Sequence, residues 1–142
     1  MKQSLPVFVD SDVVVSSLLS SSGAAFFCIN NPALKPVISD VSYKELTMVV
    51  ERLGINQHAL DDLVHRKFNV IRLNTTLKRV KEQYGRYVTD QNDAHIIAGA
   101  MRAKTKFLIS YNLKHFKIDR IKSDFDLLLL TPARFLQYLR SS

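Results

Sequence analysis

The sequence lacks the features that mark secreted and membrane proteins. It has one cysteine, Cys28, so no disulfide can form within the chain and no multi-cysteine metal motif is present. No segment approaches the roughly 20 consecutive apolar residues of a transmembrane helix. The first segment, MKQSLPVFVD, reaches an acid at Asp10 and does not match a secretory signal. We therefore expect a cytoplasmic protein, and not a secreted, membrane-spanning, disulfide-rich or zinc-ribbon protein.

Signatures of several enzyme classes are also absent. The four glycines stand apart, at positions 23, 54, 85 and 99, so the chain has no glycine-rich phosphate loop. No G-x-S-x-G turn supports a serine nucleophile. His58, His65 and His115 lack the spacing of a metal-binding histidine pair. His95 is expected to be a hydrogen-bonded histidine in or near the core, and not a metal ligand.

Basic residues outnumber acidic ones. Twenty Lys and Arg against thirteen Asp and Glu give a formal net charge of +7 at pH 7. A basic surface favours polyanionic partners such as nucleic acid or an acidic protein tail. A solvated positive surface without a specific partner is the alternative interpretation.

Short apolar segments and helical patterns alternate along the chain. Strands are expected at Leu5–Val9, Lys35–Ser39, Phe107–Ser110 and Leu127–Leu130, with a further extended piece at Asn69–Leu73. Helices are expected at Asp40–Leu53, Ala59–Phe68, Leu77–Tyr84 and Asp90–Ala103, after Thr131-Pro132, and once or twice within Val13–Asn31. The alternation predicts a single α/β domain over residues 1–142, with three α/β/α layers and a mostly parallel central sheet.

Several acids occur next to apolar segments. Asp10 and Asp12 directly follow the strand LPVFV, and Asp93 lies in the first turn of the most apolar helix. Glu45 is about 40° around its helix from Val49, at the edge of the apolar stripe. Each acid also has a purely structural interpretation. Asp10 or Asp12 would cap the following helix, Asp90 and Asp93 would occupy N-cap and N3 positions, and Glu45 would be a surface acid.

Together, these acids indicate a site. Buried carboxylates repel one another and lose hydration, so several of them near a core need a metal ion or basic partners. Sites in an open α/β sheet form outside the carboxyl ends of strands, where Asp10 and Ser110–Asn112 are both expected. Oxygen ligands without cysteine favour a hard cation, Mg²⁺ or Mn²⁺.

Five segments in order carry a resemblance to a known family: VDSD at 9–12, YKEL at 43–46, TDQNDAHIIAGAM at 89–101, KFLISYNLKHF at 106–116 and LLTPARFLQYL at 129–139. The chain resembles the PIN domain, and more narrowly the bacterial PIN-domain group identified as toxins of toxin–antitoxin pairs. The resemblance spans almost the whole chain. Each motif alone is weak, but five in order with family-like spacing are specific.

The resemblance implies a site of three acids, with Asp10 as the first, Glu45 as the second and Asp93 as the third. It gives supporting places to Asp12, Asp90, Ser110 and Asn112. Ser110 stands at the usual Thr/Ser position after a strand, where its hydroxyl orients a metal-bound water or a neighbouring acid.

The motif around Ser110 departs from the family pattern. Active relatives commonly have T-x-D-x-x-[DF], whereas Ser110-Tyr111-Asn112 places an amide at the acidic position, and His115 stands where a further acid is frequent. The amide removes one negative charge, so weaker metal binding is expected, especially at a second metal position. Asp12 would compensate in part if its side chain turned inward.

The resemblance implies metal-dependent hydrolysis of phosphodiester bonds. Asp10, Glu45 and Asp93 would hold one or two Mg²⁺ or Mn²⁺ ions, which activate a bound water and stabilise charge on the phosphate. The expected protein is an endoribonuclease acting on single-stranded or looped RNA. It would be the toxin of a type II pair, with an antitoxin as its partner. A homodimer is also expected, to which the apolar region Val13–Phe27 contributes.

Two other functions stay open. Loss of efficient catalysis through Asn112 would leave a PIN-like module that binds RNA or a protein partner. The third possibility is a nuclease of RNA processing or of DNA flaps that has no antitoxin.

Two basic groups precede and follow the acidic motifs. The first comprises Lys78, Arg79, Lys81 and Arg86, interleaved with Tyr84 and Tyr87; the second comprises Lys114, Lys117, Arg120 and Lys122. They are expected to bind RNA phosphates around the site, with a tyrosine available for base stacking. An ordinary solvated face is the alternative.

Overall fold

The computed structural model describes residues 4–141. Its strands are β1 (Leu5–Val9), β2 (Leu34–Ser39), β3 (Asn69–Ile71), β4 (Phe107–Ile109) and β5 (Leu128–Leu130). Its α-helices are α1 (Ser11–Leu19), α2 (Ala24–Ile29), α3 (Asp40–Leu53), α4 (Gln57–Lys67), α5 (Leu77–Tyr84), α6 (Ala94–Arg102), α7 (Ile118–Phe125) and α8 (Pro132–Arg140). Short 3₁₀ turns are η1 (Gly85–Tyr87), η2 (Gln91–Asp93) and η3 (Leu113–His115). Within the described range, no helix is long and apolar enough to cross a membrane.

The strands form one parallel sheet in the order β3-β2-β1-β4-β5. From β1 the chain adds β2 and β3 on one side, and it later adds β4 and β5 on the other. The switch therefore falls between β1 and β4, where Phe8 pairs with Leu108 and Val9 with Ile109. Parallel α/β sheets open a cleft at the carboxyl ends of two such strands. The predicted three-layer α/β/α fold is confirmed, with a sheet that is parallel throughout.

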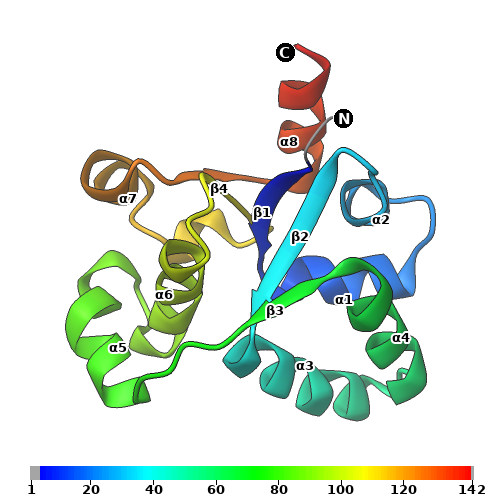
Figure 1. Cartoon of the computed structure of the whole chain (residues 1–142), viewed down its shortest axis with the longest axis horizontal. Coiled ribbons are helices and arrows are strands. Elements are labelled where there is room, and N and C mark those ends of the chain that lie inside the picture. Colours follow the sequence, from blue (N-terminus) through cyan, green and yellow to red (C-terminus); the bar gives the residue numbers. More distant parts are fainter. Residues whose placement is uncertain (1–3, 142) are drawn as a thin grey trace.

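Helices cover both faces of this sheet. Neighbouring residues of β1 point to opposite faces, so Val7 and Val9 join one hydrophobic cluster and Phe8 joins the other. The first cluster is completed by α1, α2, α3, α4 and α8, and the second by α5, α6 and α7. Figure 1 shows α1 to α4 on one side of β1 and β2, and α5 to α7 on the opposite side.

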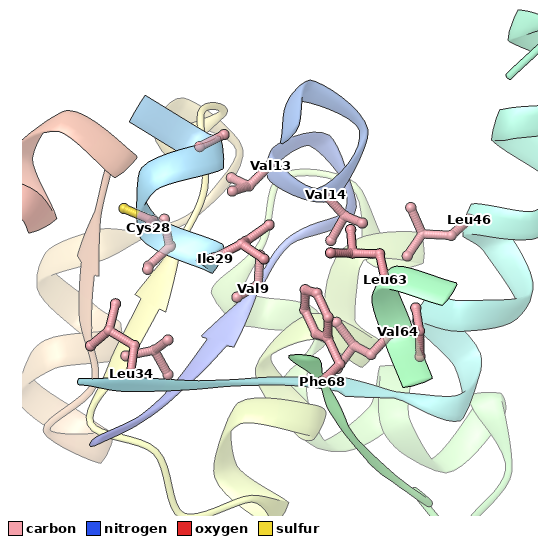
Figure 2. Packing of buried hydrophobic residues seen from close by; sticks show 14 of the residues in the cluster. Val9, Val13, Val14, Cys28, Ile29, Leu34, Leu46, Leu63, Val64 and Phe68 are labelled. Atoms are coloured by element: carbon pink, nitrogen blue, oxygen red, sulfur yellow. The ribbon is translucent and has the colours of Figure 1, made fainter. Parts of the chain in front are cut away.

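The first cluster anchors the start of α1. Figure 2 shows Val9 of β1 together with Val13 and Val14 of α1, and with Leu46 and Leu63 from α3 and α4. Val13 and Val14 are fully buried. Because this packing holds the β1–α1 junction, it also positions the acids that lie at the junction.

The second cluster brings α6 close to the centre of the sheet. Gly99 makes this possible, because a Cβ atom there would lie 2.5 Å from the Phe8 ring. All residues from Ala94 to Ala100 are buried, which confirms the prediction of a buried helix in this segment.

The start of this helix differs from the prediction. A helix was expected over Asp90–Ala103, but α6 begins at Ala94. The Asp90 side chain accepts a hydrogen bond from the N–H of Asn92 at 2.9 Å and holds the preceding residues in the 3₁₀ turn η2. A local side-chain bond therefore competes with the regular helix at this point.

Helices α4 and α7 also differ from the helices predicted from the sequence. The helix expected at Ala59–Phe68 begins earlier, at Gln57, because the Asn56 side chain accepts a hydrogen bond from the N–H of His58. Helix α7 was not predicted at all. Its apolar residues Ile118, Ile121 and Phe125 stand at i, i+3 and i+7 and pack into the second cluster, so the periodicity was present in the sequence and was overlooked.

Candidate active site

Asp10 lies at the carboxyl end of β1 beside the end of β4, in the region where parallel sheets form their cleft, and we call this region the cleft. Its Oδ2 accepts a hydrogen bond from Ser110 Oγ at 2.8 Å, and its Oδ1 accepts one from the backbone N–H of Ser11 at 2.8 Å. Asp10 is therefore both the N-cap of α1 and a residue of the cleft. It is 8% exposed, and Ser110 is fully buried.

This burial changes the acidity of Asp10. Burial, and after it the charge of Asp12, raises the pKa of Asp10 to about 7. Hydrogen bonds from Ser110 and Ser11 oppose the increase, and the charge of Asp93 adds to it. No Lys or Arg in the described range forms an ion pair with Asp10.

Asp12 and Asn112 are hydrogen-bonded to each other. Asn112 Nδ2 donates to Asp12 Oδ2 at 3.0 Å, and the N–H of Tyr111 donates to the same oxygen at 3.1 Å. The backbone N–H of Asn112 donates to Ser110 Oγ at 3.1 Å. Burial raises the pKa of Asp12, and its Oδ1 is buried without a hydrogen-bond partner. These bonds tie the start of α1 to the end of β4.

Asp93 approaches the cleft from the start of α6. It occupies the N-cap position of α6 and not the N3 position, and its side chain accepts no capping hydrogen bond. Its Oδ2 lies 4.0 Å from Nδ1 of His115. Burial and then the charge of Asp90 raise the pKa of Asp93, whereas His115 and His95 oppose the increase.

Glu45 reaches the same region from α3. His95 Nε2 lies 2.9 Å from Glu45 Oε1, and the side chains of His95 and Glu45 are 4% and 49% exposed. The prediction that His95 lies in or near the core is confirmed by its burial, and its ring faces Glu45. Its Nδ1 is buried without a hydrogen-bond partner. The charges of Glu45 and Asp93 interact, so both acids border one site.

A family model for the PIN domain matches residues 6–114 of the chain. The chain belongs to the PIN domain family. A comparison with curated protein sequences finds no significant match.

Solved structures share the PIN fold over most of this chain. A toxin–antitoxin complex from Klebsiella pneumoniae has a TM-score of 0.63 and 19% identity, covering 89% of this chain and 97% of that chain. VapBC2 from Rickettsia felis, bound to a promoter DNA fragment, has a TM-score of 0.65 and 15% identity, with coverage of 89% and 98%. VapC20 from Mycobacterium tuberculosis, a sarcin–ricin loop cleaving toxin, has a TM-score of 0.52 and 15% identity, with coverage of 72% and 86%.

The chemistry of this PIN-domain cleft fits a hard cation. Among residues 4–141, no three His, Cys, Asp or Glu side chains lie close enough together to hold a metal ion. Glu45 is turned to His95, and Asp12 to Asn112. The donors are nevertheless oxygens. The buried Asp10 with its raised pKa, and the unpartnered Oδ1 of Asp12, are groups that a nearby positive charge would stabilise.

The two predicted basic groups are carried by chain segments that run side by side. Val88 and Phe116 form an antiparallel bridge, and the N–H of Lys117 donates to the carbonyl of Tyr87 at 2.9 Å. The segment that carries Arg86 therefore runs beside the segment that carries Lys114 and Lys117.

Of the two tyrosines interleaved with the first basic group, Tyr87 is buried and is not available for base stacking. Tyr87 is 4% exposed, and its hydroxyl donates to Asp124 at 2.7 Å. Arg86 and Arg120 lie over its ring, each 5.5 Å from the centroid. The exposed aromatic residue at the site is Tyr111, which is 44% exposed. The exposure of Tyr111 at the site was not predicted, although its place between Ser110 and Asn112 is a usable signal.

Proposed function

We propose that this PIN domain is a divalent-metal-dependent endoribonuclease that hydrolyses RNA phosphodiester bonds, and that it is the toxin of a type II toxin–antitoxin pair. The burial of Asp10 beside the charges of Asp12 and Asp93 carries the proposal. No Lys or Arg in the described range pairs with these acids. Full ionisation of the group therefore calls for an external positive charge.

Mg²⁺ or Mn²⁺ would supply this charge, and when bound it lowers the pKa of a coordinated water and neutralises charge on the phosphate. Asp10, Glu45 and Asp93 would hold the ion after their side chains move closer together than they lie in the described residues. Ser110 orients Oδ2 of Asp10, and His95 holds Glu45 at the edge of the cleft. Asp12 and Asn112 brace the loop after β4, and Asp90 sets the turn before Asp93.

The excess of positive charge on the chain supports the proposed binding of RNA. The chain has a formal net charge of +7, and no Lys or Arg in the described range forms an ion pair with Asp10, Glu45 or Asp93. Phosphates on either side of the scissile bond would contact Lys78, Arg79, Lys81, Arg86, Lys114 and Lys117.

The antitoxin and a second copy of the chain are the proposed protein partners. The similar structures from Klebsiella pneumoniae and Rickettsia felis are toxin–antitoxin complexes. In the region Val13–Phe27, Leu19 and Phe27 are 66% and 53% exposed, which suits a homodimer contact. Light scattering of the wild type and of Phe27→Ser would test the dimer, because loss of this contact should shift the variant toward monomer.

Calorimetric titration with Mn²⁺ and Mg²⁺ tests the nuclease, with RNA cleavage followed in the same samples of wild type and Asp93→Asn. We expect binding and cleavage in the wild type, and loss of both in the variant. Absence of binding at millimolar metal would contradict the proposed metal site.

A catalytically weakened PIN module that binds RNA or protein is the second candidate. The observation in its favour is the amide of Asn112, which donates to Asp12 where family members commonly have an acid. Asn112→Asp separates the two functions. If metal affinity and cleavage arise only in this variant, the natural protein is the binding module.

A further inference from the structure

We propose that a small cavity beside the acidic cleft binds one nucleobase of the RNA and gives the nuclease a base preference. The cavity has a volume of about 120 Å³ and lies between α3, α5, η2 and α6. The inference rests on the proposed function, because it requires an RNA whose scissile phosphate lies at the acids.

The size and walls of the cavity suit an aromatic ring. Val41, Leu77 and Val80 supply aliphatic surface, with Val80 buried and Leu77 50% exposed at the protein surface. Pockets for drug-sized ligands usually have volumes of about 300–1,000 Å³. This cavity is smaller and matches one base, whose apolar faces would contact the aliphatic side chains.

Three polar side chains that line the cavity have no partner within the described part of the chain. Lys81, Gln91 and Asn92 line it, and their side chains make no hydrogen bond or ion pair within the described part of the chain. An amide both donates and accepts, as the edge of a base does. The two amides and the ammonium group can therefore distinguish one base edge from another.

His95 is the most buried polar side chain that lines the cavity. It lines the cavity, its side chain is 4% exposed, and its Nδ1 is buried without a hydrogen-bond partner. A buried polar atom in this state is uncommon in folded proteins. The other ring nitrogen, Nε2, lies 2.9 Å from Glu45 Oε1, so a ligand in the cavity would meet a ring that already faces Glu45.

The same residues argue against a phosphate in this cavity. Glu45 lines it as well, and Lys81 is the single basic lining residue apart from His95. A carboxylate would repel a phosphate, whereas it accepts a hydrogen bond from the amino group of a base. Gln91 and Asn92 directly precede Asp93, so the base would belong to a nucleotide next to the scissile phosphate.

Fluorescence anisotropy with labelled RNA pentanucleotides of A, C, G or U tests the cavity, in the presence of a chelator so that no cleavage occurs. We expect the wild type to prefer one base by about tenfold, the scale of a good base contact. Asn92→Ala and Gln91→Ala should bind the four pentanucleotides with nearly equal affinity. Gln83→Ala is the matched control, because Gln83 is an exposed amide of α5 that lines a different cavity, and it should keep the preference.

Cleavage-site mapping on an RNA of randomised sequence provides the second readout. The wild type should show one preferred base next to the cut, and Asn92→Ala should lose the preference at that position alone while still cutting. Equal binding of all four bases by the wild type, or an unchanged preference in both amide variants, would overturn the cavity. Absence of metal-dependent cleavage would instead contradict the proposed nuclease function. The anisotropy measurement would still test base binding in the cavity, because it is made without cleavage.

Discussion

Asp10 on the strand side of the cleft is 8% exposed and its partner Ser110 is fully buried, whereas Asp93 and Glu45 on the helix side are 31% and 49% exposed. By strand side we mean the ends of β1 and β4 with Asp10, Asp12, Ser110 and Asn112. The helix side is the starts of α3 and α6 with Glu45, Asp93 and His95. The partners differ too, since hydroxyl, amide and backbone N–H groups serve the strand side and histidines serve the helix side.

This difference follows from how each side is attached to the fold. The backbone hydrogen bonds between β1 and β4 fix the positions of the strand ends. Asp10 and Ser110 therefore come into hydrogen-bond contact through short side chains. Glu45 reaches its partner along a longer side chain from a helix. We therefore expect the strand side to control the stability of the protein and the helix side to control the capture of metal.

The largest expected effect is the pH dependence of stability in the metal-free protein. The pKa of Asp10 is about 7 in the folded state against an ordinary 3.8. As pH rises between these values the unfolded chain loses its proton first, so the folded state becomes less stable, and the loss is complete above about pH 7. The loss is on the order of a few kcal/mol, since one pKa unit corresponds to about 1.4 kcal/mol.

Urea unfolding between pH 4.5 and 8.5 in a chelator measures this loss. Asp10→Asn should flatten the profile strongly, and Asp93→Asn should change it less because Asp93 is more exposed. Equal flattening by the two variants would contradict the contrast between the two sides.

The next effect concerns Ser110. Ser110→Ala removes the donor to Asp10 and the acceptor for the N–H of Asn112, so the free energy of unfolding should fall by about 1–3 kcal/mol. Ser17→Ala is the control, because Ser17 is a buried serine whose hydroxyl donates to the carbonyl of Val14, away from the cleft. Both variants should lose stability in urea unfolding, but Ser110→Ala alone should also bind Mn²⁺ more weakly by calorimetry.

On the helix side, His95→Leu should weaken Mn²⁺ binding by about tenfold, or about 1.4 kcal/mol, because Glu45 loses the donor that holds it. The stability should change little, since the half-exposed Glu45 can be solvated by water. His95→Gln offers an amide donor in place of the ring and should recover much of the affinity. If both variants bind Mn²⁺ like the wild type, the contact with His95 does not position Glu45.

The smallest effect is expected at Asp90, which supports the helix side through the turn η2. Asp90→Ala removes the acceptor for the N–H of Asn92 and should cost about 1 kcal/mol in urea unfolding. Asp90→Ser keeps an acceptor and should recover most of this loss. A loss of Mn²⁺ binding in Asp90→Ser would show that Asp90 acts on the metal and not only on the turn.

Much of the fold was accessible from local patterns. The apolar runs around Val7 and Leu108 predicted strands, and helices α3 and α5 have the predicted bounds. Helix α7 was missed although Ile118, Ile121 and Phe125 have helical spacing, because the helix is short and its remaining residues are polar. The basic neighbours of Tyr84 and Tyr87 did not show which tyrosine is buried, and the structure covers the Tyr87 ring with two arginines and Phe125.

Part of the candidate site was likewise predictable from the sequence, and part was not. An acid directly after an apolar strand is visible in the sequence, and so is Asp93 before a run of buried residues. The pairing of His95 with Glu45 was not visible, since the two residues lie on different helices and neither has a periodic relation to the other.

The sequence by itself determined the alternation of strands and helices, the excess of positive charge and the identity of the acids, because these depend on neighbouring residues. Only the tertiary structure decided which acids are buried and which partners they have. Asp10 and Ser110 are 100 positions apart and share a hydrogen bond of 2.8 Å. That contact exists because β4 pairs with β1, and the pairing depends on helices packing on both faces of the sheet.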